Sequence, residues 1–232
     1  MHNESVTIND NSLISVNINN CSSINVSNLK YNWSNLEFYW NKLDCNRLSV
    51  TKLDKIVVDS YYGSADTITD LTVLPALRTF IAGYGFVCKV IFPPSIVTIK
   101  LGCYNQPLDT WNCPALKKLK HLDLSVGCSK FNQSLDLLYY CDNLKTLKLG
   151  NSFTHDIDML PNSVQYLELG DKFNCYTVWP DSLIELKISK AFTYPLDNLP
   201  ITLTRLTFGN ESEQSVDNLP ITFTPTFGGC FN

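Results

Sequence analysis

A duplicated segment near the C-terminus constrains the fold of this chain more than any other feature. The six residues Asp-Asn-Leu-Pro-Ile-Thr begin at Asp197 and again at Asp217, 20 residues apart. The same frame extends backwards, and an aromatic residue opens each unit at spacings of 18, 27, 22, 20 and 19 residues: Phe86, Tyr104, Phe131, Phe153, Phe173 and Phe192. A fixed period of about 20 residues is typical of stacked coils that cannot bury a core alone. We therefore predict a solenoid, with clear repeats from about residue 86 to the C-terminus.

Each unit follows one consensus, aromatic-Asn-x-x-aliphatic-Asp-x-Leu-Pro-x-Ser/Thr-Leu-x-x-Leu-x-Leu-Gly. The Leu-x-Leu predicts a short strand whose two leucines point into the core, because side chains alternate along a strand. The aromatic should stack from coil to coil, and the asparagine after it, as in Asn105, Asn132 and Asn174, can bond turn backbones or its stacked neighbours. The glycine permits a turn where a side chain would clash, and the proline presets the turn into the next strand. We assign the glycine to Gly102, Gly150, Gly170 and Gly209, and the proline to Pro94, Pro161, Pro180, Pro200 and Pro220.

This pattern resembles the FNIP repeat, a short leucine-rich-repeat-like unit abundant in slime moulds and in giant viruses of amoebae. The resemblance rests on residues 131–136 (Phe-Asn-Gln-Ser-Leu-Asp), on residues 104–109 (Tyr-Asn-Gln-Pro-Leu-Asp) and on the two duplicated segments. The chain departs from it at Ser212, where the aromatic is missing, and at Thr154 and Thr193, which replace the asparagine. The resemblance implies a mainly β fold, an open parallel solenoid of short coils with one strand per repeat and few or no helices.

Residues 1–75 carry a weaker pattern. Alternating apolar pairs predict short strands there, at spacings too short for the later coils: Val16/Ile18, Ile24/Val26, Leu36/Phe38, Leu48/Val50 and Ile56/Val58. We interpret residues 1–75 as a β-rich N-terminal cap or as degenerate repeats. This part should continue into the repeat solenoid of residues 76–232, whose first clearer strand lies near Phe80 and Ala82. Trp33 and Trp40 should cover the exposed end of the core.

Many FNIP proteins of giant viruses carry an F-box before the repeats, and that motif would make the chain an adaptor of a ubiquitin ligase. An F-box is a short helical segment. Residues 1–50 show β alternation and many asparagines instead. We therefore predict no F-box, which counts against the adaptor function.

The charge balance bears on the class of partner. The formal net charge is −4 and the pI is about 5.3, which gives no basic footprint for nucleic acid and no polybasic patch for anionic lipid. No run of about 20 apolar residues is present to span a membrane, and the N-terminus lacks the basic start and apolar run of a signal peptide. We expect an intracellular, cytoplasmic protein, located in the host cytoplasm if the protein is viral, that binds neither nucleic acid nor membranes.

The titratable residues form no catalytic pattern. His121 and Asp123 lie two apart in one predicted strand without a nucleophile in the same frame, and Cys103 and Cys128 are spaced from His121 like no zinc motif. Cys113 and Cys141 stand near the leucine before the proline and should be buried small hydrophobic residues. No glycine-rich phosphate loop, Gly-x-Ser-x-Gly or paired-acid motif occurs. We predict no enzyme activity, no cofactor and no metal.

The predicted strands place two columns of side chains outward. The first contains Lys100, Asp123, Lys148, Glu168, Lys187 and Thr207. The second contains Thr98, His121, Thr146, Tyr166, Glu185 and Arg205. In the first column the signs alternate, so neighbours about 4.8 Å apart would attract by about 0.2–1 kcal/mol each, either as a ladder that sets register or as a mixed-charge binding strip. The second column holds Tyr, His and Arg, which often anchor partners.

These observations favour a non-catalytic, protein-binding repeat scaffold that uses the two columns as its partner-binding surface. Two alternatives stay open. One is a substrate-recognition subunit for host ubiquitin ligation, which the resemblance suggests. The other is a structural or self-assembling protein, because the last coil lacks the polar cap that solenoids usually carry and could associate with another copy.

Overall fold

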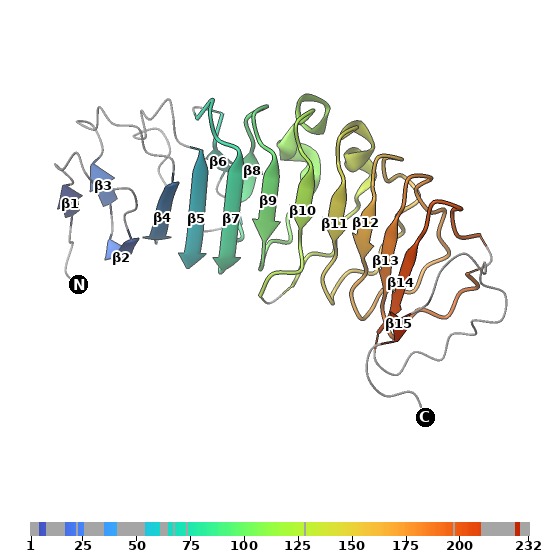
Figure 1. Cartoon of the computed structure of the whole chain (residues 1–232). Helices are drawn as coiled ribbons and strands as arrows, with labels where there is room; N and C mark the ends of the chain where they lie inside the picture. The colour runs from blue at the N-terminus through green and yellow to red at the C-terminus, as the bar shows by residue number, and fades with distance from the viewer. Residues whose placement is uncertain are drawn as a thin grey trace.

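The computed structural model describes residues 54–60, 65–66, 68–72, 74–127, 129–196 and 198–209, with four short strands nearer the N-terminus and one nearer the C-terminus. Figure 1 shows strands lying side by side in one gently curved row. Eleven strands form this parallel sheet, in the spatial order β2 (Asn17–Cys21), β4 (Asn35–Trp40), β5 (Lys55–Ser60), β7 (Thr79–Tyr84), β9 (Thr98–Leu101), β10 (His121–Asp123), β11 (Thr146–Lys148), β12 (Tyr166–Glu168), β13 (Glu185–Ile188), β14 (Arg205–Phe208) and β15 (Thr226–Phe227). The predicted parallel solenoid with one strand per repeat is confirmed.

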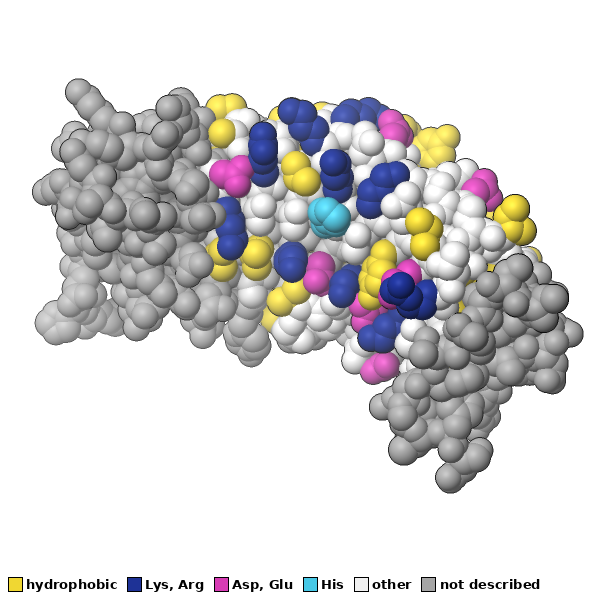
Figure 2. Space-filling view, in the orientation of Figure 1, with side chains coloured by type: hydrophobic (Ala, Val, Ile, Leu, Met, Phe, Trp, Pro, Cys, Tyr) yellow, Lys and Arg dark blue, Asp and Glu magenta, His cyan; other side chains and the backbone are white. Residues whose placement is uncertain are grey.

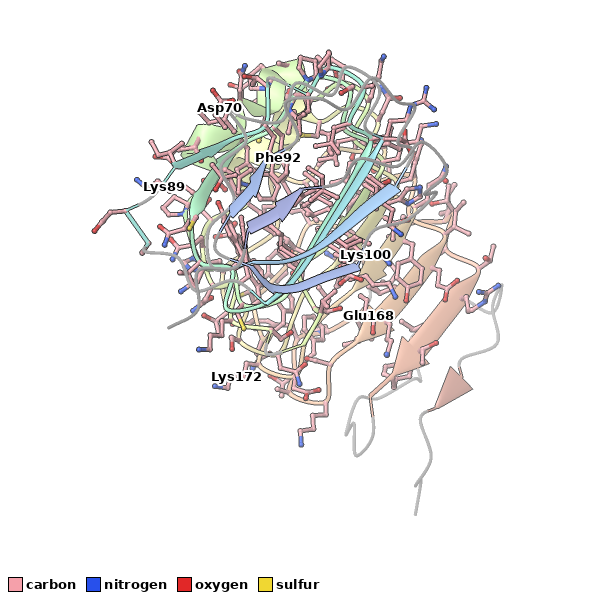
Figure 3. The ribbon with its side chains drawn as sticks, turned by 90° about the vertical axis from the view of Figure 1, so that its left-hand side faces the viewer. Asp70, Lys89, Phe92, Lys100, Glu168 and Lys172 are labelled. Carbon is pink, nitrogen blue, oxygen red and sulfur yellow. The ribbon has the colours of Figure 1, made fainter. Side chains whose placement is uncertain are left out.

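The side of each coil opposite the sheet has little regular structure. Within the described residues it contains the parallel pair β6 (Ile68–Asp70) and β8 (Lys89–Ile91) and three short 3₁₀ helices, η2 (Leu108–Trp111), η3 (Cys113–Ala115) and η4 (Asp136–Tyr140). A further pair joins β1 (Ser5–Thr7) to β3 (Ser23–Asn25). Seen along the stack in Figure 3, Lys100 and Glu168 lie on the strand side, Asp70 and Lys89 lie on the opposite side, and Phe92 lies between them. No helix among the described residues is long and apolar enough to cross a membrane.

The core lies between these two sides and is built by the strand alternation. The parallel pairing puts the middle residue of each strand in register with that of the next strand. These residues have no exposed surface: Ile99, Leu122, Leu147, Leu167, Leu186 and Leu206. Each coil buries them only against its neighbours, so stacking supplies the stability that a single coil lacks.

The aromatic anchors form a second ladder behind the leucines, as predicted. Neighbouring ring centroids are 6.0–6.5 Å apart, and the ring planes are tilted by 5–21°. The stacked pairs are Phe86–Tyr104, Tyr104–Phe131, Phe131–Phe153, Phe153–Phe173 and Phe173–Phe192. Offset stacking of this kind stabilises a core beyond the burial of area alone.

The longest coil, from Tyr104 to Lys130, places its extra residues where the core can use them. Trp111, from η2, is fully buried, packs edge-on against Phe92 at 5.0 Å and donates a hydrogen bond from Nε1 to the Tyr104 hydroxyl at 2.9 Å. The repeat consensus assigned no role to this tryptophan. The insertion therefore fills the core on the side away from the sheet and leaves the strand register unchanged.

The asparagine that follows each anchor links one coil to the next, as predicted. Asn132 Oδ1 accepts hydrogen bonds from the backbone N–H of Thr154 at 2.9 Å and from its hydroxyl at 3.2 Å. Asn105 Oδ1 accepts from the N–H of Asn132 at 2.8 Å, and Asn174 Oδ1 accepts from the N–H of Thr193 at 3.0 Å. Backbone N–H groups in turns need hydrogen-bond acceptors. These bonds therefore hold the loop of each coil against the corresponding loop of the preceding coil.

A comparable ladder at the other edge of the sheet was not predicted. The serine or threonine of the consensus donates from its hydroxyl to a leucine carbonyl of the preceding coil. The bonds join Ser95 to Leu77 (2.7 Å), Ser163 to Leu144 (2.8 Å) and Thr202 to Leu183 (2.8 Å). The consensus contained this position, but only the stacked structure shows what its hydroxyl contacts.

One of the proline assignments was wrong, and the structure shows why the consensus glycines are needed. Pro93, not Pro94, occupies the turn position, because the carbonyl of Pro93 accepts from Ile96 N at 3.1 Å as that of Pro161 accepts from Val164 N. The glycines are required by close approach between coils. A Cβ on Gly170 would lie 2.0 Å from the carbonyl oxygen of Gly150, so no side chain fits there.

Some predictions about the two ends of the chain fall outside the described residues. β2, β4 and β5 belong to the same sheet as the later strands and overlap the predicted pairs at 18, 36/38 and 56/58. The pair at 48/50, the side chains of Trp33 and Trp40 and the unit opened by Ser212 are not described.

Candidate binding surface on the strand side

The strand register puts the twelve predicted residues into two straight columns. Thr98, His121, Thr146, Tyr166, Glu185 and Arg205 pair strand to strand in one column, and Lys100, Asp123, Lys148, Glu168, Lys187 and Thr207 pair in the other. We call these two columns the strand face. Figure 2 shows basic and acidic side chains intermixed on it toward the later strands, with a band of Lys and Arg over the starts of the earlier ones.

A hollow of about 330 Å³ opens in the strand face over β9, β10 and β11. Its walls carry six of the twelve residues: Thr98, Lys100, His121, Asp123, Thr146 and Lys148. His121 Nδ1 lies 3.2 Å from Thr146 Oγ1, which orients the ring. Partial burial, together with the nearby charges of Lys120 and Lys100, lowers the pKa of His121. The imidazole is therefore neutral at neutral pH and presents both a donor and an acceptor.

The alternating charge ladder forms only in part. Asp123 turns to the loop after its strand and accepts from Ser125 N at 3.0 Å and Ser125 Oγ at 2.6 Å. The strand face therefore has an earlier half, over β9 and β10, where Lys100 makes no ion pair with a described residue. Its later half, over β11 to β14, is linked by charges.

Glu168 is the centre of that later half. Its carboxylate accepts from Lys187 Nζ at 2.6 Å and from the Tyr166 hydroxyl at 2.8 Å, and it lies 3.2 Å from Lys148 Nζ. Burial alone would raise the pKa of Glu168, but the bonds from Lys187, Tyr166 and Lys148 outweigh it and lower the pKa. The same ammonium of Lys148 lies 5.2 Å from the centre of the Tyr166 ring, a cation–π contact. One strand further, Arg205 pairs with Glu185.

His121 and Asp123 are the titratable residues of the strand face that lie in one strand. His121 and Asp123 bond to Thr146 and Ser125, so neither orients the other as a catalytic pair would require. Among the described residues, no three His, Cys, Asp or Glu side chains are grouped to hold a metal ion. Cys113 and Cys141 are buried free thiols, as predicted. Cys103, by contrast, is disulfide-bonded.

Sequence reasoning missed a second and larger hollow, of about 610 Å³, where the strands begin. Its basic side chains are Arg78, Lys117, Lys118 and Lys120. They come from the loops before β7 and β10, and only Arg78 and Lys120 directly precede a strand. The one indication in the sequence was the cluster of lysines at 117, 118 and 120. The net charge of −4 for the whole chain gives no sign of this local positive charge.

Taken together, the parallel sheet, the leucine ladder and the polar face define a leucine-rich-repeat-like β-solenoid. Residues 131–172 match the family model described as FNIP Repeat, the repeat that the consensus resembles. No curated protein matches the chain.

Two solved structures share the fold. One is CroV588, a giant-virus protein described as a novel circular LRR protein, with a TM-score of 0.55 and 24% identity over 92% of this chain and 40% of its own. The other is an internalin (inlF) from Listeria monocytogenes, with a TM-score of 0.54 and 15% identity over 90% of this chain and 58% of its own. This chain spans less than two thirds of the length of either one.

Proposed function

We propose that the protein is a non-catalytic interaction scaffold that binds another protein through the strand face. The observation that carries this proposal is the hollow over β9 to β11, which six of the twelve outward residues line. Leucine-rich-repeat-like solenoids typically serve as interaction scaffolds, and extended repeat surfaces are their usual binding sites.

The two halves of the strand face suit different parts of recognition. The hollow offers a neutral imidazole, hydroxyls and the ammonium of Lys100, which together form a small polar socket. The later half is held in place before binding by the bonds around Glu168, so a partner would order few side chains there. Preorganisation of this kind lowers the entropic cost of association. Tyr166 and Arg205 are the residue types that most often dominate binding energy.

The test is affinity capture with the tagged protein from amoebal lysate, followed by titration of purified candidates. Two double variants disable the two halves separately, Lys100→Ala/His121→Ala and Tyr166→Ala/Arg205→Ala. The matched control is Lys172→Ala, which removes an exposed lysine outside the strand face. A partner retained by the control and lost by either double variant supports the proposal. Equal binding by all four proteins would refute it.

The same capture separates the alternatives. Subunits of a cullin complex among the captured proteins would favour a role in substrate recognition for ubiquitin ligation. Concentration-dependent sedimentation of the pure protein would favour self-assembly. The proposed cytoplasmic location is tested by the redox state of Cys103 in cells, because disulfides are rare in reducing compartments. A reduced Cys103 in cells would support the cytoplasmic location, and retention of the disulfide that the structure contains would contradict it.

A further inference from the structure

The larger hollow, which we call the basic groove, lies at the edge of the sheet where the strands begin. It has a volume of about 610 Å³ and shares no lining residue with the hollow of the strand face. Its basic side chains are Arg78, Lys117, Lys118 and Lys120, and Asp54 is the one carboxylate among the described residues that line it. Figure 2 shows the corresponding band of Lys and Arg over the starts of β7 to β11.

Not all of these cations are neutralised within the protein. Arg78 Nε lies 3.6 Å from Asp54, and Lys117 Nζ lies 2.6 Å from Asp142, both on exposed side chains. Lys118 and Lys120 are exposed and make no ion pair with any described residue. Exposed pairs such as the first two are weak, and an incoming anion can replace them at little cost.

Coil stacking extends this positive charge along the edge. The backbone N–H of Lys145 donates to the carbonyl of Lys120 at 2.8 Å, so these two lysines hold the same position in successive coils. His121 follows Lys120 directly, and its pKa is lowered by burial and then by the charges of Lys120 and Lys100. The positive field of the basic groove thus reaches the strand face, although the whole chain carries a net charge of −4.

The lining also indicates the kind of anion. Pro75, Ala76 and Val97 contribute an apolar floor between the cations. Such a floor suits the methylene groups of extended acidic side chains. Among the described residues that line the groove none is aromatic, whereas aromatic side chains are what unpaired bases stack on.

We propose that the basic groove binds a short, extended segment of a partner protein that is rich in aspartate and glutamate. Lys118 and Lys120 supply the free cations, and Arg78 and Lys117 exchange their own carboxylates for those of the segment. This site does not depend on the strand-face proposal, since the two hollows have no residue in common.

The experiment measures fluorescence anisotropy of a labelled peptide that alternates glutamate and aspartate, against a glutamine and asparagine peptide of equal length. The acidic peptide should bind the wild-type protein, and the affinity should fall as salt is raised. The double variant Lys118→Glu/Lys120→Glu should lose at least about tenfold in affinity, because two attractions become repulsions. Lys172→Glu, which changes the same charge outside the groove, should bind like the wild type.

Two further measurements keep the result unambiguous. Circular dichroism and thermal melting verify that each variant is folded. The strand-face variant Tyr166→Ala/Arg205→Ala should bind the acidic peptide normally, even if it has lost its protein partner. Equal binding of the neutral peptide, or full binding by the Lys118/Lys120 variant, would overturn the proposal. Displacement of the peptide by a lower concentration of single-stranded oligonucleotide would overturn it in favour of a nucleic-acid site.

Discussion

Replacing Phe153 by alanine removes the middle of the aromatic ladder. The ring is fully buried, its centre lies 6.2 Å from those of Phe131 and Phe173, and its plane is tilted by 9° to each. Loss of a buried phenylalanine side chain costs about 3–5 kcal/mol. Each lost ring pair adds about 0.5–1.5 kcal/mol beyond the buried area. We therefore expect the free energy of unfolding to fall by at least about 3 kcal/mol, a large share of the 5–15 kcal/mol that is usual for a folded domain.

Phe153→Leu separates stacking from burial. Leucine keeps most of the apolar volume but loses both ring pairs, so the expected loss is about 1–3 kcal/mol. Urea denaturation followed by circular dichroism measures both variants. Ile201→Ala is the control, because Ile201 is 98% exposed and its truncation should change stability by less than about 0.5 kcal/mol.

The location of the damage gives a second check. Coils contact only their neighbours, so amide exchange in Phe153→Ala should accelerate first in β11, β12 and β13. A loss below about 1 kcal/mol for Phe153→Ala, or uniform acceleration across the array, would refute the reasoning that the rings form a coil-to-coil core.

Three other predictions concern single positions. Asn132→Ala removes the acceptor for two bonds from Thr154 and should cost about 1–3 kcal/mol in urea unfolding, whereas an unchanged midpoint would contradict the asparagine ladder. Gly170→Ala places a Cβ 2.0 Å from the Gly150 oxygen and should destabilise strongly or prevent soluble expression, with a normal melting temperature as the contrary result. Glu168 has a folded-state pKa below its ordinary value of 4.5, so its contribution is present above pH 4.5 and is lost as pH falls through the lowered pKa. The stability gap between wild type and Glu168→Gln should therefore shrink in acid, and a gap that is independent of pH would rule this out.

Much of the fold could be predicted because the repeat keeps a fixed phase. The Leu-x-Leu segments locate the strands, and their alternation decides which side chains face outward. The phase also locates the aromatic and asparagine ladders, because each depends on one position in every coil. The phase could not distinguish the adjacent prolines Pro93 and Pro94. Only the hydrogen bond from Ile96 N to the Pro93 carbonyl shows which proline begins the turn.

The binding surfaces were predictable only where they follow the strands. The columns of the strand face follow from alternation, but the turn of Asp123 toward Ser125 depends on the local loop. Arg78 and Lys120 of the basic groove hold the same repeat position, but Lys117 and Lys118 come from the longest coil, so the period alone does not predict the groove. Trp111 was missed for the same reason, because it lies in the insertion that interrupts the repeat.

The strands keep a constant register although the coils differ in length, and this register sets the spacing of the side chains on the strand face. Coils from 18 to 27 residues long all deliver their outward side chains to the same two columns. These side chains therefore occupy a lattice of about 4.8 Å across the strands and about 6.6 Å along them. The strand face therefore presents its side chains at regular intervals, and each coil adds one interval. If the strand face binds a partner as proposed, a substitution in one coil would alter the contact at that position, and the loss or gain of a whole coil would change the length of the surface.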